Sequence, residues 1–359
     1  ELEEDELLGQ FMACRLLEVF DALKNSARLV YLAECGGREP GEIYGEAEQA
    51  MEAAVAKLAG PLPPRPQPQP RKEGKVDFLA RYGEAPEDFL EGIRRAKEHI
   101  FAGDIFQVVP SRQFRAGLTQ PCFNFYRRLR QVNPSPYMFY LDFERVRLVG
   151  ASPEMLVKVS GRKIYTYPIA GTRKRGQNEA EDEELAAELQ TDTKECAEHS
   201  MLVDLARNDL GRLSRPGTVR VTKLRQIEYF SHVMHMVSEV TGELSEHLTP
   251  PDVLQATFPA GTVSGAPKLR AMEIINELEK VPRGTYAGTV GYLDFAGNMD
   301  MCITLRTMRI ENGKTALIQS GAGIVADSVP EKEYQEILQK SRALFEVVEE
   351  VENGAVTFR

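Results

Sequence analysis

The 359-residue sequence contains no tryptophan and lacks the patterns of several protein classes. No apolar run approaches the roughly 20 residues that a membrane-spanning helix needs. The five cysteines are scattered, odd in number and never spaced as C-x-x-C, which argues against a disulfide framework or a zinc site and fits a reducing cytosol. The first residues are acidic, so they do not form a signal peptide, and we expect a cytoplasmic protein.

An excess of positive charge is also missing. The net charge of −10 argues against nucleic acid or an anionic membrane as the main partner. No Walker-type loop, no G-x-G-x-x-G after an expected strand, and no Ser-His-Asp or Cys-His arrangement is recognisable. A hydrophobic content of 42% and a charged content of 27% indicate a globular protein, long enough for two or three domains.

A proline-rich stretch at residues 61–75 forms the clearest boundary in the chain. We interpret it as an exposed, semi-rigid linker rather than a docking motif for a proline-binding module. Residues 1–60 precede it and predict two strands around a turn at 24–26, followed by a helix over 42–58 that ends at Gly60. Residues 76–359 are expected to form the main domain.

The main domain predicts an α+β fold with large antiparallel β-sheets. Tight turns such as Gly297-Asn298 and Asn312-Gly313 join neighbouring strands, which favours antiparallel pairing, and helices interrupt the strands in blocks. Helices are expected at 86–102, 124–132, 179–189, 192–207, 266–278 and 330–351. Strands are expected at 104–112, 137–143, 147–151, 154–159, 163–168, 286–295, 299–310 and 314–319, with strands and a helix alternating through 219–240.

The stretch from Phe258 to Met272 predicts a glycine-rich turn that leads into a helix. Gly261 and Gly265 allow a bound group to approach the backbone, Ser264 is a candidate helix cap, and Pro267 suits a first helical turn. Exposed amide groups at a helix start attract anions. The alternative is an ordinary junction between a loop and a helix.

Two expected helices each carry a pair of glutamates three residues apart, Glu195 with Glu198 and Glu333 with Glu336. Such pairs share a helix face. If the two faces meet, the carboxylates repel one another, and Mg2+ would offset this repulsion while keeping coordination sites for substrate oxygens and water.

Each pair also has an explanation that needs no metal. Asp192 and Glu195 match a helix capping box. Glu336 can form an ion pair with Lys340 on a solvated helix face.

Basic residues lie beside the glycine-containing stretches. Lys268 and Arg270 follow the loop at 258–267, three basic residues follow Gly171-Thr172, and Arg306 closes an expected strand. A planar guanidinium matches a carboxylate bidentately, so we infer a substrate with more than one carboxylate. The alternatives are a basic surface turn at 171–176 and a tight bend at 321–323.

The histidines His232 and His235 lie three positions apart in an expected strand, so they face opposite sides of it. One of them can therefore enter a site. A structural role is the alternative.

Several stretches in unbroken order resemble the chorismate-utilising enzymes, and within them the anthranilate synthase component I family. They cover roughly residues 76–350: 106–112, 133–138, 150–154, 168–172, 198–211, 231–235, 258–272, 321–331 and Lys340. The resemblance implies the fold of these enzymes, in which the sheets form a sandwich with helices on the outside.

The resemblance also implies a reaction. Chorismate would bind with Mg2+, ammonia would attack C2 of the ring, the C4 hydroxyl would leave, and pyruvate would be eliminated to give anthranilate, the first step of tryptophan biosynthesis. This makes the chain a lyase. Ammonia would come from a glutamine amidotransferase subunit (component II) on a separate chain, because no amidotransferase nucleophile motif is recognisable here.

The family's functional residues carry over to matching positions. Catalytic roles fall on Glu154, the acid for the leaving hydroxyl, on His235, implicated in the elimination, and on Thr262 and Gln107. Metal binding falls on Glu198 and Glu336, with Glu195 and Glu333 in support. The remaining substrate contacts fall on Gly171, Thr172, Tyr286, Arg306, Gly321, Ala322, Gly323 and Lys340.

Two positions discriminate between members of the family. Relatives that add water to chorismate carry a lysine base where this chain has Gln107, and many aminodeoxychorismate synthases carry a lysine where it has Ala170. A neutral glutamine is a poor base, so ammonia is favoured over water. Aminodeoxychorismate synthase component I and a non-catalytic chorismate-binding scaffold remain the alternatives.

The chain departs from the family pattern at its amino-terminal part, which is longer in the family and carries a Leu-Leu-Glu-Ser element that helps to hold feedback tryptophan. That element is absent from the sequence, so we expect the chain to begin inside the family pattern. Four positions match the remaining part of the tryptophan pocket: Pro136, Tyr137, Met138 and Cys302. We therefore expect weak or absent inhibition by tryptophan.

Overall fold

The computed structural model describes residues 8–62, 75–230 and 233–354. The chain forms two compact units, Glu1–Gln67 and Pro68–Arg359. Most of the expected linker, residues 63–74, and the histidine His232 lie outside the described residues. No helix in the described ranges is both long and apolar enough to cross a membrane.

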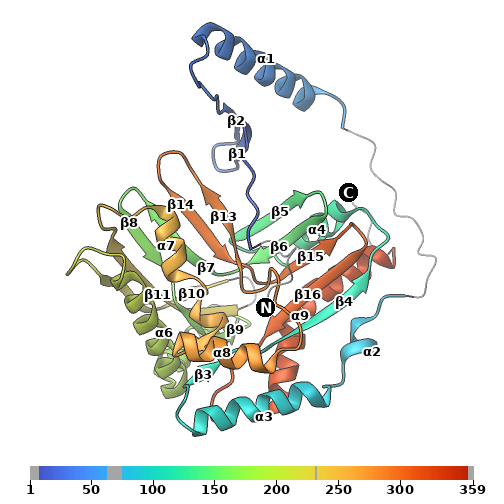
Figure 1. The fold of residues 1–359 in the computed structure, drawn as a ribbon. Coiled ribbons are helices and arrows are strands. Elements are labelled where there is room, and N and C mark those ends of the chain that lie inside the picture. The colour runs from blue at the N-terminus through green and yellow to red at the C-terminus, as the bar shows by residue number, and fades with distance from the viewer. Residues whose placement is uncertain (1–7, 63–74, 231–232, 355–359) are drawn as a thin grey trace. The chain divides into compact units, whose positions relative to one another are not determined.

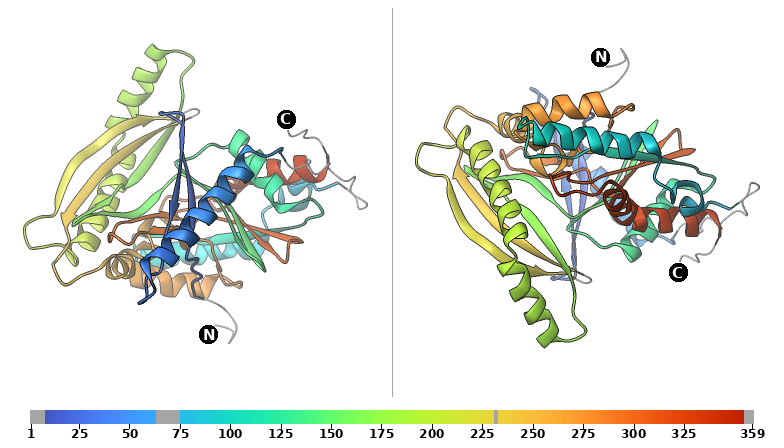
Figure 2. Two further views of the ribbon diagram at one scale, coloured as in Figure 1. Left: turned by 90° about the horizontal axis from the view of Figure 1, so that it is seen from above. Right: turned by 90° about the horizontal axis from the view of Figure 1, so that it is seen from below.

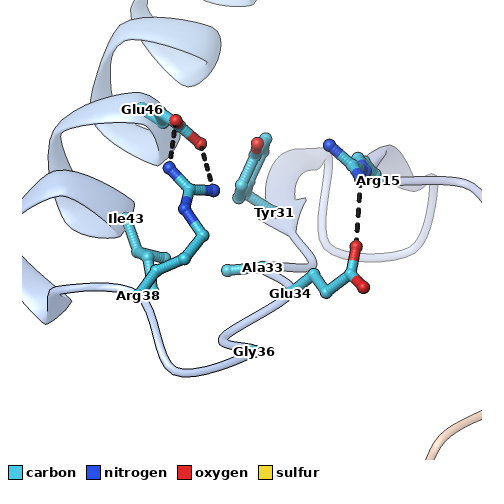
Figure 3. A pocket seen from close by; sticks show the side chains of 8 residues that line it. All are labelled: Arg15, Tyr31, Ala33, Glu34, Gly36, Arg38, Ile43 and Glu46. Carbon is cyan, nitrogen blue, oxygen red and sulfur yellow. Dashed lines mark hydrogen bonds and ion pairs between the residues drawn. The ribbon is translucent and has the colours of Figure 1, made fainter.

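The first unit consists of a hairpin, β1 (Leu16–Asp21) and β2 (Ser26–Tyr31), and a helix, α1 (Pro40–Ala59). The expected turn is present, and Asn25 takes the left-handed backbone conformation there, with φ 48°. Among the described residues of this unit, 8–62, Ile43 and Ala54 are the only buried hydrophobic residues. A pocket between the hairpin and the helix is lined by two ion pairs, Arg15–Glu34 and Arg38–Glu46 (Figure 3).

The second unit is built on two antiparallel sheets (Figure 1). The five-stranded sheet has the order β4-β16-β15-β6-β5. The seven-stranded sheet has the order β10-β11-β8-β7-β14-β13, and β9 also pairs with β11. A short ladder joins β3 to β12.

The strands of the five-stranded sheet are β4 (Ser111–Gly117), β5 (Tyr137–Phe143), β6 (Val146–Ser152), β15 (Thr307–Glu311) and β16 (Thr315–Gly321). Those of the seven-stranded sheet are β7 (Met155–Ser160), β8 (Lys163–Thr166), β9 (Ile169–Lys174), β10 (Arg220–Tyr229), β11 (Val233–Glu243), β13 (Thr289–Leu293) and β14 (Met299–Ile303). The short ladder consists of β3 (Gln107–Val108) and β12 (Gly265–Ala266).

Helices cover the outer faces of the two sheets, which form the layers of a sandwich (Figure 2). On the five-stranded side lie α2 (Phe78–Tyr82), α3 (Glu87–Phe101), α4 (Cys122–Val132) and α9 (Pro330–Glu352). On the seven-stranded side lie α5 (Glu179–Thr191), α6 (Thr193–Gly211) and α7 (Pro250–Thr257). The short helix η1 (Gly261–Val263) and the helix α8 (Lys268–Leu278) follow α7. The predicted α+β fold is confirmed.

Each sheet packs its own apolar core against its helices. The larger core lies between the five-stranded sheet and α3, α4, α8 and α9, and the fully buried Phe114, Phe125 and Tyr334 lie in it. A second core joins β7, β8, β11 and β14 to α6 and α7. Burial of these side chains stabilises each layer by roughly 25 cal/mol per Å² of apolar area removed from water.

The chain passes directly from strand to strand between the two sheets at two places in the described residues, from β6 to β7 and from β14 to β15. The two crossings are hydrogen-bonded to each other: the amide of Ile303 donates to the carbonyl of Glu154 at 3.0 Å, and that of Ala151 donates to the carbonyl of Arg306 at 3.2 Å. The Ser152 hydroxyl donates to the carbonyl of Ile303 at 2.5 Å. The crossings therefore lie side by side.

Most expected elements are present with small shifts at their ends, but some predictions are wrong. Residues 220–229 and 233–243 form two long strands, and the described part of 219–240 contains no helix. The expected strand at 104–112 is instead divided between β3 and the start of β4. Pro110, which lies between them, has no amide hydrogen for a ladder. The stretch at 171–176, for which a surface turn was one alternative, begins within strand β9.

Candidate active site

The first crossing places Glu154 beside the start of β7, in the interior between the sheets. The hydroxyl of Thr262, from η1, donates a hydrogen bond to Oε1 of Glu154 at 2.8 Å. Burial raises the pKa of Glu154 to about 7, although this hydrogen bond and the charges of Lys340 and Arg306 act in the opposite direction. A carboxyl group with such a pKa holds a proton near neutral pH, as a general acid requires.

The second crossing places Arg306 opposite Glu154. Its backbone has φ 45°, a left-handed conformation that is uncommon outside glycine and occurs where the chain leaves one sheet for the other. Burial lowers the pKa of Arg306, and the charge of Glu154 opposes this effect. The two crossings thus bring an acid and a cation together.

Strands β9 and β11 add a hydroxyl and an imidazole. His235 is the direct partner of Thr172 in the ladder, and its Nδ1 lies 3.0 Å from the Thr172 hydroxyl. Burial lowers the pKa of His235, so the ring is neutral at pH 7. Gly171 has φ 77°, and a Cβ atom there would lie 3.3 Å from a carboxylate oxygen of Glu195, so the backbone approaches that carboxylate closely.

The glycine-rich end of β16 approaches two site residues. A Cβ atom on Gly321 would lie 2.7 Å from the Tyr286 hydroxyl, and one on Gly323 would lie 2.6 Å from Nε2 of Gln107. Ala322, between them, is fully buried. Side chains at 321 and 323 would therefore fill the space that Tyr286 and Gln107 occupy.

The two glutamates of α6 have different partners. Glu195 forms an ion pair with Arg173 of β9 at 3.4 Å. Glu198 accepts a hydrogen bond from Nε2 of the buried Gln107 at 3.4 Å. Burial, and then the charges of Glu195 and Glu336, raise the pKa of Glu198. The carboxylates of α6 and α9 are therefore near enough to repel one another.

The capping box at the start of α6 is only half formed. The Asp192 side chain accepts hydrogen bonds from the amides of Lys194 and Glu195, each at 3.0 Å, as an N-cap does. The Asp192 amide, however, donates to the carbonyl of Glu188, and the Glu195 carboxylate is paired with Arg173. The Glu195 carboxylate thus forms an ion pair with Arg173 instead of the second hydrogen bond of a capping box.

The glutamates of α9 lie near the glycine-rich end of β16. Glu336 forms an ion pair with Lys340 at 2.7 Å, as the alternative for this pair predicted. Lys340 also donates to the carbonyl of Gly321 at 3.1 Å, which places its ammonium group beside the glycines at 321–323. Burial raises the pKa of Glu333, while a hydrogen bond with Ser328 opposes this.

The four glutamates provide the hard oxygen donors that Mg2+ prefers. Within the described ranges, no three acidic, histidine or cysteine side chains converge closely enough to hold a metal ion. Arg173 and Lys340 instead neutralise one glutamate on each helix. The donor set fits Mg2+ in kind, and metal binding would compete with these two ion pairs.

The four residues matched to a tryptophan pocket lie on both sheets. Pro136 and Met138 flank Tyr137 at the start of β5, and the Tyr137 hydroxyl donates to Asp300 of β14 at 2.9 Å. Cys302, two residues further along β14, is buried. These positions join the five-stranded to the seven-stranded sheet.

The loop at 258–267 contributes to the site in another way than its sequence suggested. Ser264 does not cap α8: its hydroxyl donates to the carbonyl of Ala260, and Pro267 occupies the N-cap position. Lys268 pairs with Asp209 at 3.0 Å, and Arg270 pairs with Asp104 at 3.0 Å. The two basic side chains at this helix start are therefore already paired, and the loop contributes Thr262 to the candidate site.

Arg173 is a site residue that sequence reasoning missed. It forms ion pairs with Glu188, Asp192 and Glu195. The basic run after Thr172 was visible, but which of its residues faces the acidic helices depends on the pairing of β9 with β11.

The chain matches the family described as chorismate binding enzyme over residues 2–346, and it belongs to this family. Within the family it is similar to proteins named anthranilate synthase component 1. The protein of that name from Thermus thermophilus is 52% identical over 96% of this chain and 72% of its own length. The one from Acetivibrio thermocellus is 57% identical over 74% of this chain and 53% of its own length.

Solved structures give the same family. A crystal structure of anthranilate synthase component I from Streptococcus pneumoniae matches with a TM-score of 0.79 and 42% identity, over 91% of this chain and 71% of that one. A menaquinone-specific isochorismate synthase from Escherichia coli matches with a TM-score of 0.71 and 25% identity, over 85% of this chain and 69% of that one.

Proposed function

We propose that this chain is an anthranilate synthase component I, which converts chorismate and ammonia into anthranilate and pyruvate. The observation that carries the proposal is Glu154, a carboxyl group with a pKa of about 7 that is hydrogen-bonded by Thr262 and faces Arg306. The names of the relatives and the family match support the same reaction.

The chain's own residues supply binding and proton transfer. Arg306 and Lys340 are the cations for the two carboxylates of chorismate, together with the backbone at Gly171 and at 321–323. Glu154 donates its proton to the departing C4 hydroxyl, and Thr262 holds the carboxyl in place for this step. Neutral His235, oriented by Thr172, lies ready to accept a proton during elimination of pyruvate.

Mg2+ is the proposed cofactor, held by Glu198 and Glu336 with Glu195 and Glu333 in support, and it would supply charge stabilisation at the substrate's carboxylate. We propose a glutamine amidotransferase chain as the source of ammonia and the cytoplasm as the location. The neutral Gln107, hydrogen-bonded to Glu198, provides no base for water, which favours ammonia as nucleophile.

Purified protein, chorismate, Mg2+ and an ammonium salt at pH 8 test the proposal, with anthranilate fluorescence as the readout. We expect anthranilate and pyruvate in equal amounts, and no anthranilate after chelation of the metal. Formation of aminodeoxychorismate or isochorismate without anthranilate would reject the proposal. Chorismate binding without turnover would favour a scaffold. Adding tryptophan to the same assay tests the expectation of weak or absent inhibition.

A further inference from the structure

Arg283, in the connection between α8 and β13, makes four hydrogen bonds from one guanidinium group. Its Nη1 donates to the carbonyl of Val263 at 2.7 Å, and its Nη2 donates to the carbonyl of Val109 at 2.6 Å. Nε and Nη2 donate to the two carboxylate oxygens of Glu279 at 2.9 and 2.6 Å. The side chains of Arg283 and Glu279 are 18% and 9% exposed, so this pair is largely buried.

Both carbonyls belong to segments that line the candidate active site. Val263 directly follows Thr262, whose hydroxyl binds Glu154. Val109 donates its own amide to the carbonyl of Ser264 at 2.9 Å and precedes Pro110, whose carbonyl accepts from the amide of Ala322 at 3.2 Å. Arg283 therefore joins the loop that carries Thr262 to the segment that supports the substrate-binding glycines.

Arg283 also contacts Tyr286, a third site residue. The guanidinium carbon of Arg283 lies 5.5 Å from the centre of the Tyr286 ring, and the Tyr286 amide donates to the carbonyl of Arg283 at 3.1 Å. The Glu279 carboxylate in turn accepts hydrogen bonds from the amide and hydroxyl of Ser111, each at 2.8 Å.

A guanidinium group is suited to this position because its donors lie in one plane at fixed angles. Here it satisfies two main-chain carbonyls and a carboxylate at once. An amide side chain cannot satisfy the same acceptors, so its presence leaves buried acceptors unpaired and frees Val263 and Val109 to shift.

We propose that Arg283 is a positioning residue that holds the Thr262 hydroxyl on the Glu154 carboxyl and the Tyr286 ring beneath the glycines at 321–323. Arg283 acts through these residues and not on the substrate. The predicted effect on turnover rests on the proposed function, whereas the effect on Glu154 does not.

The first test is a double-mutant cycle on turnover of chorismate. Arg283→Gln and Thr262→Val should each lower kcat about 10- to 100-fold, because small displacements of a proton donor are costly, while KM changes less. If Arg283 acts through Thr262, the double variant should be no slower than the slower single variant. Multiplication of the two losses would overturn the proposal.

The second test needs no turnover. The Thr262 hydrogen bond lowers the pKa of Glu154, so its loss should raise that pKa further. The pKa follows from the pH dependence of the unfolding free energy, compared between chains with Glu154 and with Glu154→Gln. Arg283→Gln and Thr262→Val should both move the midpoint upward by about 0.5 pH unit. A downward movement, as water entry into a loosened site would cause, would overturn the proposal.

Arg128→Gln is the matched control, because Arg128 also binds both carboxylate oxygens of a glutamate, Glu350, between α4 and α9. The Arg128→Gln substitution should lower the free energy of unfolding without changing kcat or the pH midpoint of the Glu154 titration. Should Arg283→Gln fold poorly, Arg283→Lys retains the charge opposite Glu279 and should show the same upward movement.

The two proposals fail in different ways. A wild-type chain that makes no anthranilate rejects the proposed function, and the Glu154 midpoint then still decides the role of Arg283. An active wild-type chain whose Arg283→Gln variant keeps both its kcat and the Glu154 midpoint rejects only the positioning role.

Discussion

The glycine-rich end of β16 presents backbone groups to the site, whereas β9, β11 and α6 present ionisable side chains. Helix α9 adds Lys340 and two glutamates near these glycines. On the five-stranded side, Gly321 and Ala322 continue β16 above a core formed with α9 and α4. On the seven-stranded side, His235 and the glutamates of α6 are held by hydrogen bonds and an ion pair. We call residues 321–323 the packed wall, because they depend on packing, and β9, β11 and α6 the charged wall, because they depend on charge. Substitutions in the two walls should therefore have different effects.

The largest expected effect comes from the charged wall. Glu198→Gln should lower turnover of chorismate by roughly 1,000-fold, since it removes a proposed metal ligand. The free energy of unfolding should rise slightly, because burial and the neighbouring carboxylates both oppose the charge of Glu198. Steady-state rates and urea unfolding check both expectations. Glu184→Gln, an exposed change on α5, is the control, and a parallel loss of stability and activity in Glu198→Gln would contradict the distinction between the walls.

The next effect concerns the crossing that joins the walls. Glu154→Gln should lower kcat by about 100- to 1,000-fold, the range for loss of a general acid. The pKa of Glu154 is 4.5 in the unfolded chain and about 7 in the folded wild type, so between these pH values only the folded state binds the proton. The free energy of unfolding therefore falls as pH rises through this window. This pKa shift corresponds to about 3 kcal/mol of unfolding free energy, and the partial exposure of Glu154 makes the actual contribution smaller.

The measurement is the unfolding free energy of both chains between pH 4 and 9. Glu154→Gln should be the more stable chain above pH 7 and should lose the advantage near pH 4.5. Equal pH profiles would show that the Glu154 carboxyl titrates at its ordinary value.

Larger side chains in the packed wall should lower stability. Gly321→Ala should cost about 1–3 kcal/mol of stability and raise KM for chorismate, because the new methyl group would lie 2.7 Å from the Tyr286 hydroxyl and 2.9 Å from the Pro110 carbonyl. Calorimetry and KM measurements check this. Gly92→Ala in α3, where a methyl group meets nothing within 4 Å, should instead stabilise by about 0.5–1 kcal/mol. If both alanines behaved alike, packing at Gly321 would not be the cause.

The smallest effect should come from a bond between the sheets. Tyr137→Phe removes the hydroxyl that binds Asp300, which Lys158 still neutralises at 3.0 Å. We expect a loss of about 1 kcal/mol in urea unfolding and little change in turnover. A large loss of turnover would mean that this bond controls the spacing of the two walls.

The sequence was sufficient for most elements and for the assignment of the family, because turns such as Asn312-Gly313 and helix stops such as Gly60 are local signals. It was insufficient where partners come from distant segments. The pairing of Arg173 with Glu195 depends on the placement of β9 beside α6, and the role of Arg283 depends on carbonyls 20 and 174 positions away. Lys268 and Arg270 failed as anion-binding candidates for the same reason, because acidic side chains elsewhere in the chain already bind them.

The two adjacent crossings make the seven-stranded sheet a single insertion, since all its strands lie between Met155 and Ile303. Glu154 precedes this segment and Arg306 follows it, so both charges remain with the host when the segment is exchanged. Replacement of residues 155–303 by the equivalent segment of a relative would exchange His235 and the glutamates of α6 in a single step. The fold therefore keeps the acid and the cation outside the segment that carries His235 and the glutamates of α6.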